Sequence, residues 1–246
     1  RSTQAKTLFP YTTLFRSSKP ELMPDVGQLF KALQRVTVND RRKAGGWADQ
    51  EVAELAAIEV QNSGSCLVIV NTKASARRIF ELCASVLASD AIFHLSTDMC
   101  PAHRKTRLAA LLARLREGLP TLCVSTQLIE AGVDVDFGSV IRFMAGLDSI
   151  AQAAGRCNRN GRRVKGSVYV VNPQVENLDK LPDILQGRNA ALRVLDEFRQ
   201  KPERFDDDLL SPAAMHAYYR YYFFDRAGDM SYALAAGAAA QADTLL

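Results

Sequence analysis

The stretch Cys66–Val70 (CLVIV) is a continuous apolar run. A strand that is covered on both faces of a sheet has this pattern. A stretch with the helical spacing of apolar residues follows, and the same alternation then repeats along the chain. Further strands are predicted at Ala91–Leu95, Thr121–Val124, Val140–Met144 and Ser167–Val171, with helices between them. This strand–helix alternation predicts an α/β fold with a doubly wound, mainly parallel sheet.

The stretches between the predicted strands have the apolar spacing of helices. The first carries an apolar stripe from Ile79 to Leu87, and the second begins near Pro101 and ends near Gly118. Proline is favoured in the first turn of a helix, and glycine just beyond its end. The remaining helices are predicted at Gln127–Ala131, Ser149–Arg159 and Ile184–Arg199, followed by an aromatic-rich helix. The last two form a helical C-terminal extension.

The composition fits a globular chain with a sizeable core. Its 246 residues are 48% hydrophobic and 24% charged, which are ordinary values for such chains. The net charge of +4 is mildly basic, so it permits a nucleic-acid partner without requiring one. No apolar run reaches the roughly 20 residues that a membrane-spanning helix needs, and no membrane partner is expected.

The five cysteines are scattered along the chain without a C-x-x-C pair. Cys66, Cys83 and Cys123 lie in apolar runs, where a free thiol packs as a small hydrophobic group. This pattern indicates a reducing cytoplasm rather than a disulfide framework. Cys100 and His103 have a ligand-like spacing, but structural zinc needs four ligands and no second pair lies nearby. No metal site is predicted.

Polar residues follow the first three predicted strands directly. They are Asn71-Thr72, Ser96-Thr97 and Ser125-Thr126. In doubly wound sheets, binding sites gather beyond the carboxyl ends of the strands. Hydroxyl groups and free N–H groups at the start of a helix bind phosphate. These pairs therefore predict contacts with a nucleic-acid backbone, although a plain turn or a helix cap would use the same residues.

Two arginines stand three residues apart in Gln152-Ala-Ala-Gly155-Arg156-Cys-Asn-Arg159. We expect them on the short predicted helix, behind a glycine that lets this helix lie close to a neighbour. Planar, permanently charged guanidinium groups suit a site that neutralises charge on a phosphoryl group during transfer. The pattern therefore indicates a phosphoryl-transfer site, and the alternative is a solvated basic helix.

Val124–Asp134 and Gln152–Gly161 together resemble the fifth and sixth motifs in the second motor domain of superfamily 2 helicases. They are most similar to those of the CRISPR-associated helicase–nuclease of type I interference systems. The resemblance implies a RecA-like lobe in which Arg159 is the arginine finger. It also implies that Arg156 contacts phosphate or couples the nucleotide to the other lobe, and that Gln152 orients groups near the γ-phosphate.

The same resemblance assigns further residues to the nucleotide and to the nucleic-acid strand. Gly132, Asp134 and Gly155 are expected at the nucleotide, with Asp134 near its ribose. The residues expected to contact the backbone of the tracking strand are Asn71, Thr72, Ser96, Thr97, Arg104, Ser125 and Thr126. For Arg104, a solvated helix face is the alternative.

Several motifs of a complete helicase do not occur in this sequence. It contains no G-x-x-x-x-G-K-[ST] loop, no acidic run of the D-E-x-H type at a strand end, and no histidine beside an aspartate. We therefore expect a fragment that lacks the first motor lobe and the HD nuclease domain. ATP with Mg²⁺ would be bound mainly by the missing lobe, so the isolated chain is expected to be inactive as an ATPase.

The chain is predicted to comprise four regions. They are a non-native or disordered leader (1–18), the end of a preceding motor lobe with a helix leading out of it (19–63), the RecA-like helicase C-terminal domain (64–175), and linker helices with the start of a truncated accessory domain (176–246). The resemblance implies the second motor lobe of an ATP-dependent DNA helicase or translocase in CRISPR type I antiviral defence. Its expected partners are single-stranded DNA, the first motor lobe and an RNA-guided surveillance complex. Another superfamily 2 RNA or DNA helicase and a non-catalytic nucleic-acid-binding module are the alternatives.

Overall fold

A computed structural model describes residues 34–130 and 132–226, together with Ala32, Gly228, 231–234 and 238–241. The chain divides into two compact units, 1–34 and 35–246, and nearly all of the described residues belong to the second. The leader predicted over 1–18 lies outside the described residues, and so does Ala131, the last residue of one predicted helix.

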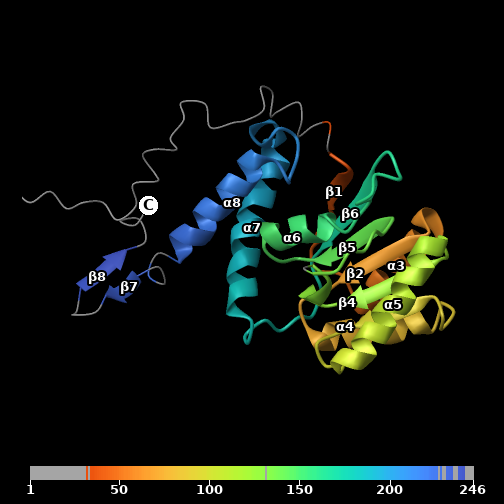
Figure 1. Cartoon of the computed structure of the whole chain (residues 1–246). Helices are drawn as coiled ribbons and strands as arrows, with labels where there is room; N and C mark the ends of the chain where they lie inside the picture. The colour runs from red at the N-terminus through yellow and green to blue at the C-terminus, as the bar shows by residue number, and fades with distance from the viewer. Residues whose placement is uncertain are drawn as a thin grey trace, which may run out of the picture. The chain divides into compact units, whose positions relative to one another are not determined.

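The second unit is built on a six-stranded sheet in which every strand pair is parallel (Figure 1). The strands lie in the order β1-β6-β5-β2-β4-β3. Their bounds are Val36–Asp40 for β1, Ser65–Ile69 for β2, Ile92–Leu95 for β3, Thr121–Ser125 for β4, Ser139–Phe143 for β5 and Gly166–Val171 for β6. The predicted α/β fold with a doubly wound parallel sheet is confirmed.

Helices follow the strands and cover both faces of the sheet (Figure 1). They are α3 (Asp49–Ser63), α4 (Lys73–Ala84), α5 (Pro101–Glu117), the 3₁₀ turn η1 (Gln127–Ile129), α6 (Leu147–Ala154), α7 (Pro182–Gln200), the 3₁₀ turn η2 (Pro202–Phe205) and α8 (Pro212–Asp225). An antiparallel pair, β7 (Ser231–Leu234) and β8 (Ala238–Gln241), comes later in the sequence. None of the helices in the described part of the chain is both long and apolar enough to cross a membrane.

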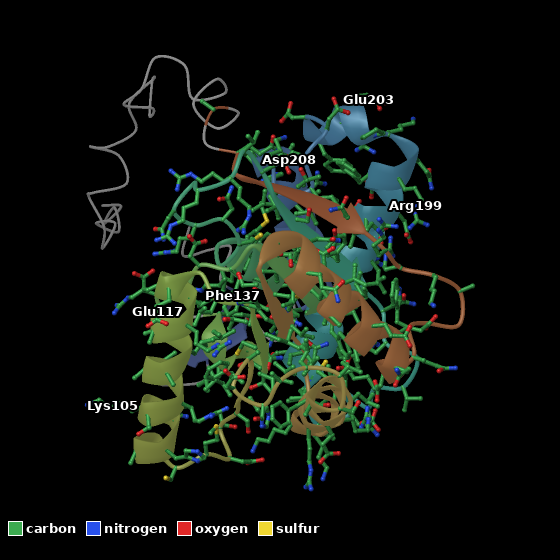
Figure 2. All side chains as sticks on the ribbon, turned by 90° about the vertical axis from the view of Figure 1, so that its right-hand side faces the viewer. Lys105, Glu117, Phe137, Arg199, Glu203 and Asp208 are labelled. Atoms are coloured by element: carbon green, nitrogen blue, oxygen red, sulfur yellow. The ribbon has the colours of Figure 1, made fainter. Side chains whose placement is uncertain are left out.

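Alternate residues of the central strands enter two hydrophobic clusters, one on each face of the sheet. In β2, Cys66 packs with α3 and α4, whereas Leu67 packs with α5 and α6. Successive side chains of a strand point to opposite faces, so a strand buried on both faces has to be apolar throughout. On the outer side of α5, Lys105 and Glu117 point away from the sheet (Figure 2).

The edge strand β1 is a strand that the sequence pattern does not predict. Its residues, VTVND, are partly exposed, and they pair with β6 from Val36↔Gly166 to Asp40↔Val170. An edge strand with a polar end lacks the continuous apolar run that marks a central parallel strand. The sheet therefore includes residues from the region predicted to precede the RecA-like domain, while the predicted domain boundaries stay a prediction.

The helix predicted over Ser149–Arg159 is wrong in its extent, because α6 ends at Ala154 and both arginines follow it. The main chain of Asn158 is left-handed, with φ of 47°, and a right-handed helix cannot contain that conformation. The expected close approach at Gly155 is also not found. The nearest atoms that a Cβ would meet there are carbonyl oxygens of α6 itself.

The helices α7 and α8 form a third hydrophobic cluster together with α6. Tyr218 of α8 is 2% exposed, and its hydroxyl donates to Oδ1 of Asp148 over 2.7 Å. The ring fits there because Gly146 and Gly187 carry no side chain: a Cβ on them would lie 2.5 and 3.2 Å from the hydroxyl oxygen. The aromatic-rich helix is therefore a packing element at Tyr218, although Phe224 near its end is 79% exposed.

Candidate functional site

Arg159 and Asp134 lie toward the edge of the sheet that is opposite to the predicted strand-binding residues. Because the strands all run in one direction, their carboxyl ends share one edge. The predicted strand-binding pairs lie at the ends of β2, β3 and β4 at that edge, and Ser125 is the last residue of β4. Asp134 and Arg159 lie instead toward the amino ends of β5 and β6, where Phe137 and Cys157 form a parallel bridge. Arg159 and Asp134 are thus separated from the strand-binding pairs, whereas Arg156 donates to the carbonyl oxygen of Glu130, which follows β4.

The loop that carries Arg159 is anchored through its backbone. The N–H of Arg159 donates to Oδ1 of Asp136 over 2.8 Å, and its carbonyl oxygen accepts from Nη1 of Arg35 over 2.5 Å. Asn158 is buried, and its Nδ2 donates to the carbonyl oxygens of Arg35 and Arg163 over 3.0 and 2.8 Å. The main chain is therefore fixed, which is the condition for holding a functional side chain in place.

The side chain of Arg159 remains accessible on this fixed loop. It is 47% exposed and forms an ion pair with Asp134, whose side chain is 88% exposed, over 2.9 Å from Nε to Oδ1. An exposed pair of this kind contributes about 0–1 kcal/mol, so little free energy opposes its exchange for a ligand. The structure thus brings together two residues that the sequence assigns separately to the nucleotide, and their role there stays a prediction.

Arg156 lies in the same region and is held more firmly. Its Nη2 donates to the carbonyl oxygen of Glu130 over 2.5 Å. Burial, and then the charge of Arg159, lowers the pKa of Arg156 from its usual value. Gln152 is exposed on α6. Gly132 has φ of 72°, a left-handed conformation that glycine adopts without strain, so it can turn the chain toward the aspartate of the exposed pair.

At the carboxyl edge, several predicted strand-binding side chains already have partners inside the lobe. Asn71 is 3% exposed, and its Nδ2 donates to the carbonyl oxygen of Met144 over 3.0 Å and to Oε2 of Glu176 over 2.9 Å. Oγ1 of Thr72 accepts the N–H of Ser75 over 3.1 Å and so caps α4. Both side chains stabilise the fold, which leaves main-chain groups as the simplest contacts for a strand.

The hydroxyl groups at the ends of β3 and β4 differ in whether they have hydrogen-bond partners inside the lobe. Oγ of Ser96 accepts from the N–H of Asp98 over 3.1 Å, and Oγ of Ser125 donates to a carbonyl oxygen of β3 over 3.0 Å. Thr97 is exposed and Thr126 is 6% exposed, and neither side chain has a hydrogen bond within the described residues. The hydroxyl group of Thr97 is therefore open to a ligand, whereas that of Thr126 is without a hydrogen bond but buried.

The helix starts at this edge favour anions. The helices α4 and α5 follow β2 and β3, and neither has an acidic residue in its first turn. Backbone N–H groups and the helix dipole attract phosphate at such a start. Arg104 lies near the start of α5, is half-buried, and has no ion-pair partner in the described part of the chain. The carboxyl edge therefore suits a phosphate backbone.

A buried arginine that the sequence reasoning missed lies close to both sites. Arg142 of β5 is 0% exposed, its Nε lies 2.8 Å from Oε1 of Glu130, and its Nη1 donates to Oδ1 of Asn71 over 2.6 Å. Burial dominates both ionic groups: it lowers the pKa of Arg142 and raises that of Glu130. The network joins Asn71 at the strand edge to the residue that holds Arg156. An arginine inside the apolar run VIRFM is the signal that could have found it.

The part of the chain that carries this geometry is similar to a known protein family. Residues 62–162 match the family described as CRISPR-associated nuclease/helicase Cas3, C-terminal. The chain matches the C-terminal helicase region of Cas3. The matched segment contains every predicted site residue, from Asn71 to Arg159. The resemblance to a CRISPR-associated helicase–nuclease is thereby confirmed.

Individual Cas3 proteins support the match over different lengths. The CRISPR-associated nuclease/helicase Cas3 of Haloferax volcanii is 60% identical over 64 residues, which are 24% of this chain and 7% of the relative. The structure of T. fusca Cas3 with AMPPNP has a TM-score of 0.57 at 20% identity, over 80% of this chain and 26% of that chain. A second structure of T. fusca Cas3 has a TM-score of 0.54 at 19% identity, over 78% of this chain and 27% of that chain. At these identities the structures establish the fold alone, and this chain spans about a quarter of each of those two chains.

Proposed function

We propose that this chain is the second motor lobe of an ATP-dependent DNA helicase or translocase that acts in CRISPR type I antiviral defence. In this role it supplies Arg159 as an arginine finger and contacts the backbone of a single DNA strand. The match to the Cas3 helicase region supports the helicase assignment. The observation that carries the proposal further is the exposed pair of Arg159 and Asp134 on an anchored loop.

The exposed pair has the chemistry to meet a nucleotide. The planar fork of Arg159 donors matches phosphate oxygens, and the Asp134 carboxylate can accept the hydrogen of a ribose hydroxyl. Arg156, held on a carbonyl oxygen, places a second positive charge nearby. Gln152, exposed on α6, would orient groups near the γ-phosphate. An arginine finger contributes about 10³–10⁵ in rate, because it stabilises charge that develops on the transferring group.

ATP and Mg²⁺ supply the phosphoryl-transfer chemistry when they are bound, and we assign most of their contacts to a first motor lobe. The described residues contain no group of three or more His, Cys, Asp or Glu side chains that could hold a metal ion. The solved structures of T. fusca Cas3 include forms with ATP and with AMPPNP. They support ATP as the nucleotide that Arg159 and Asp134 would meet.

Single-stranded DNA is the proposed partner at the carboxyl edge. The starts of α4 and α5, which have no acidic residue in their first turns, support contacts that are mainly to phosphate, together with Thr97, Thr126 and Arg104. In the proposed role an RNA-guided surveillance complex recruits the DNA. Free, buried thiols such as Cys66 and Cys123 support a reducing cytoplasmic setting.

Steady-state ATP turnover tests whether ATP is bound mainly by a first motor lobe, with this lobe supplying Arg159. The chain alone should show no turnover above background with single-stranded DNA, because its sequence contains no phosphate-binding loop of the Walker type. The chain fused to the first motor lobe of a Cas3 protein should show turnover that DNA stimulates. Robust turnover by the chain alone would show that the nucleotide is bound differently from our proposal.

A further inference from the structure

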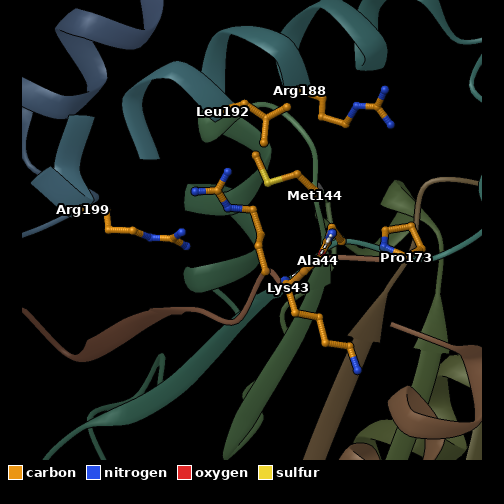
Figure 3. Close-up of a pocket in the computed structure, with 9 residues that line it drawn as sticks. Lys43, Ala44, Met144, Pro173, Arg188, Leu192 and Arg199 are labelled. Carbon is orange, nitrogen blue, oxygen red and sulfur yellow. Dashed lines mark hydrogen bonds between the residues drawn. The ribbon is translucent and has the colours of Figure 1, made fainter. Parts of the chain in front are cut away.

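A cavity of about 420 Å³ lies at the carboxyl edge of the sheet, and none of the site residues assigned so far lines it. Its walls come from α7 and from the segments that follow β1, β5 and β6 (Figure 3). Four of its lining residues are cationic and none is acidic. The lining residues that matter for its chemistry are Arg42, Lys43, Arg188 and Arg199, together with the apolar Met144 and Leu192.

Three of the four cations are already paired. Arg42 and Arg199 both bind Asp40, at 2.8 and 2.7 Å, and Lys43 binds a glutamate of α3 at 2.6 Å. Arg188 differs from them. Within the described residues it forms neither a hydrogen bond nor an ion pair, and its Nε is buried without a partner. Its charge acts on Glu176, where it partly offsets the rise in pKa that burial causes, but the two groups form no ion pair. A buried donor without a hydrogen-bond partner is costly, so this guanidinium can still bind an anion.

The position of Arg188 suits an extended ligand better than a small ion. Arg188 also lines a second cavity of about 400 Å³, whose other lining residues are 174–179 and Leu185 and include the acidic Glu176 and Asp179. The two cavities differ in charge, so the phosphate is expected on the side of the first, which has no acidic lining residue. In Figure 3, Arg188 and Arg199 lie on opposite sides, with Met144 and Leu192 between them. Charged groups beside apolar side chains match a nucleotide unit, which has a phosphate at one end and a sugar and base at the other.

The cavity continues the edge that is predicted to bind a strand. The predicted strand-binding pairs lie at the ends of β2, β4 and β3, and the cavity lies at the ends of β1, β6 and β5 in the same sheet. With about 4.8 Å between neighbouring strands, five spacings give an edge of roughly 24 Å. One nucleic-acid strand that follows this edge would run from the start of α5 to Arg188.

We infer that Arg188 and this cavity bind a backbone phosphate of single-stranded DNA, with Met144 and Leu192 against the sugar or base of the same nucleotide. The guanidinium fork fits two phosphate oxygens at once. The contact is to the backbone, so it carries no preference for sequence. This inference rests on the proposed function, because it extends the strand path of the same lobe.

Salt-dependent binding of fluorescent oligo-dT and oligo-dA by the full chain tests the inference. The Arg188→Ala chain should bind both oligonucleotides about tenfold more weakly than the unchanged chain. The slope of log K against log salt should become shallower by about 0.7, which corresponds to one lost phosphate contact on a single strand. Arg188→Gln is measured beside it, so that a folding defect in one variant does not decide the result.

The matched control is Arg193→Ala on the same helix. Arg193 pairs with Asp225 at 3.2 Å and does not line the cavity, so its loss should leave both affinity and slope unchanged. Unchanged binding by both Arg188 variants would overturn the inference and leave the proposed function standing. An equal loss in the Arg193 variant would also overturn it, because it would reflect net charge alone. No salt-dependent binding by the unchanged chain would overturn both proposals.

Discussion

Two arginine–carboxylate pairs in this lobe have almost the same geometry and opposite surroundings. Arg142 and Glu130 lie 2.8 Å apart, with side chains 0% and 5% exposed. Arg159 and Asp134 lie 2.9 Å apart, with side chains 47% and 88% exposed. Distance alone would rank the two pairs equally. Burial makes the first pair a fixed part of the fold and leaves the second open to a ligand.

The difference follows from desolvation. Removing one partner of a buried pair leaves a charge without compensation in a medium of low dielectric constant, whereas water replaces the partner of an exposed one. Arg142 is also fixed by donating to Asn71 and to the carbonyl oxygen of Phe143. The chain has 31 lysines and arginines. The candidates for function among them are those with an anchored main chain and a weakly held side chain.

The largest expected effect on stability is at the buried pair. Arg142→Ala should lower the free energy of unfolding by about 3–5 kcal/mol, because the carboxylate of Glu130 stays buried without its partner. Urea unfolding measures this loss, with the exposed Arg116→Ala as control. Since burial already raises the pKa of Glu130, protonation relieves part of the cost, and the loss should be smaller at pH 5 than at pH 8. If Arg142→Ala lowered the free energy of unfolding no more than Arg116→Ala does, the buried pair would not differ from an exposed residue.

A hydrogen bond of intermediate burial should have an intermediate effect. Tyr218 donates to Asp148, whose side chain is only partly buried. Tyr218→Phe should lower the free energy of unfolding by about 1.5 kcal/mol, the lower end for a hydrogen bond to a charged group. Tyr219→Phe is the control, because the hydroxyl of Tyr219 has no hydrogen bond among the described residues. Equal losses of unfolding free energy in the two variants would show that the hydrogen bond from Tyr218 to Asp148 does not stabilise the fold.

A third ionic cluster predicts a dependence on pH. Burial acts to raise the pKa of Asp40, but hydrogen bonds and charge from Arg42, with a hydrogen bond from Arg199, outweigh it and hold this pKa below its usual value. A lowered pKa in the folded state gives stability above the unfolded-state value of about 3.9, and this stability is lost as pH falls through the folded-state value. Asp40→Asn should therefore flatten the fall in unfolding free energy between about pH 4 and pH 2. Parallel curves for the two proteins would contradict this assignment.

The exposed pair should have the smallest effect on folding. Asp134→Asn should change the free energy of unfolding by no more than about 0.5 kcal/mol, because water solvates Arg159 once the carboxylate is gone. Urea unfolding at pH 7 measures the change. A loss of about 2 kcal/mol or more would make the pair structural, and the contrast with the buried pair would disappear.

The fold could be predicted because its central strands are buried on both faces. The CLVIV run of β2 has no polar position, since each face meets helices. The strand β1 could not be predicted in the same way. It pairs with β6 alone at the edge of the sheet, so its sequence carries exposed and polar positions that do not distinguish a strand from a loop.

The residues proposed for the candidate site come from sequence motifs and stay a prediction, whereas their surroundings could not be read from those motifs. The end of α6 before the arginines depends on Asn158 and its bonds to Arg35 and Arg163. The partner of the Ser125 hydroxyl is a carbonyl oxygen on another strand. Such contacts join segments that are distant in sequence, and local patterns do not encode them. Arg142 was visible as one charged residue in an apolar run, and only the fold shows its partners.

The most direct test of the central claim is the ATP turnover of an enzyme that combines this lobe with a first motor lobe. Arg159→Lys should lower turnover by about 10³-fold or more and leave binding of ATP and single-stranded DNA within about twofold, because lysine keeps the charge and loses the planar fork. Arg162→Lys is the matched control, since Arg162 is exposed nearby and has no partner among the described residues. Its turnover should stay unchanged. Equal turnover in the two variant enzymes would contradict the assignment of Arg159 as the arginine finger.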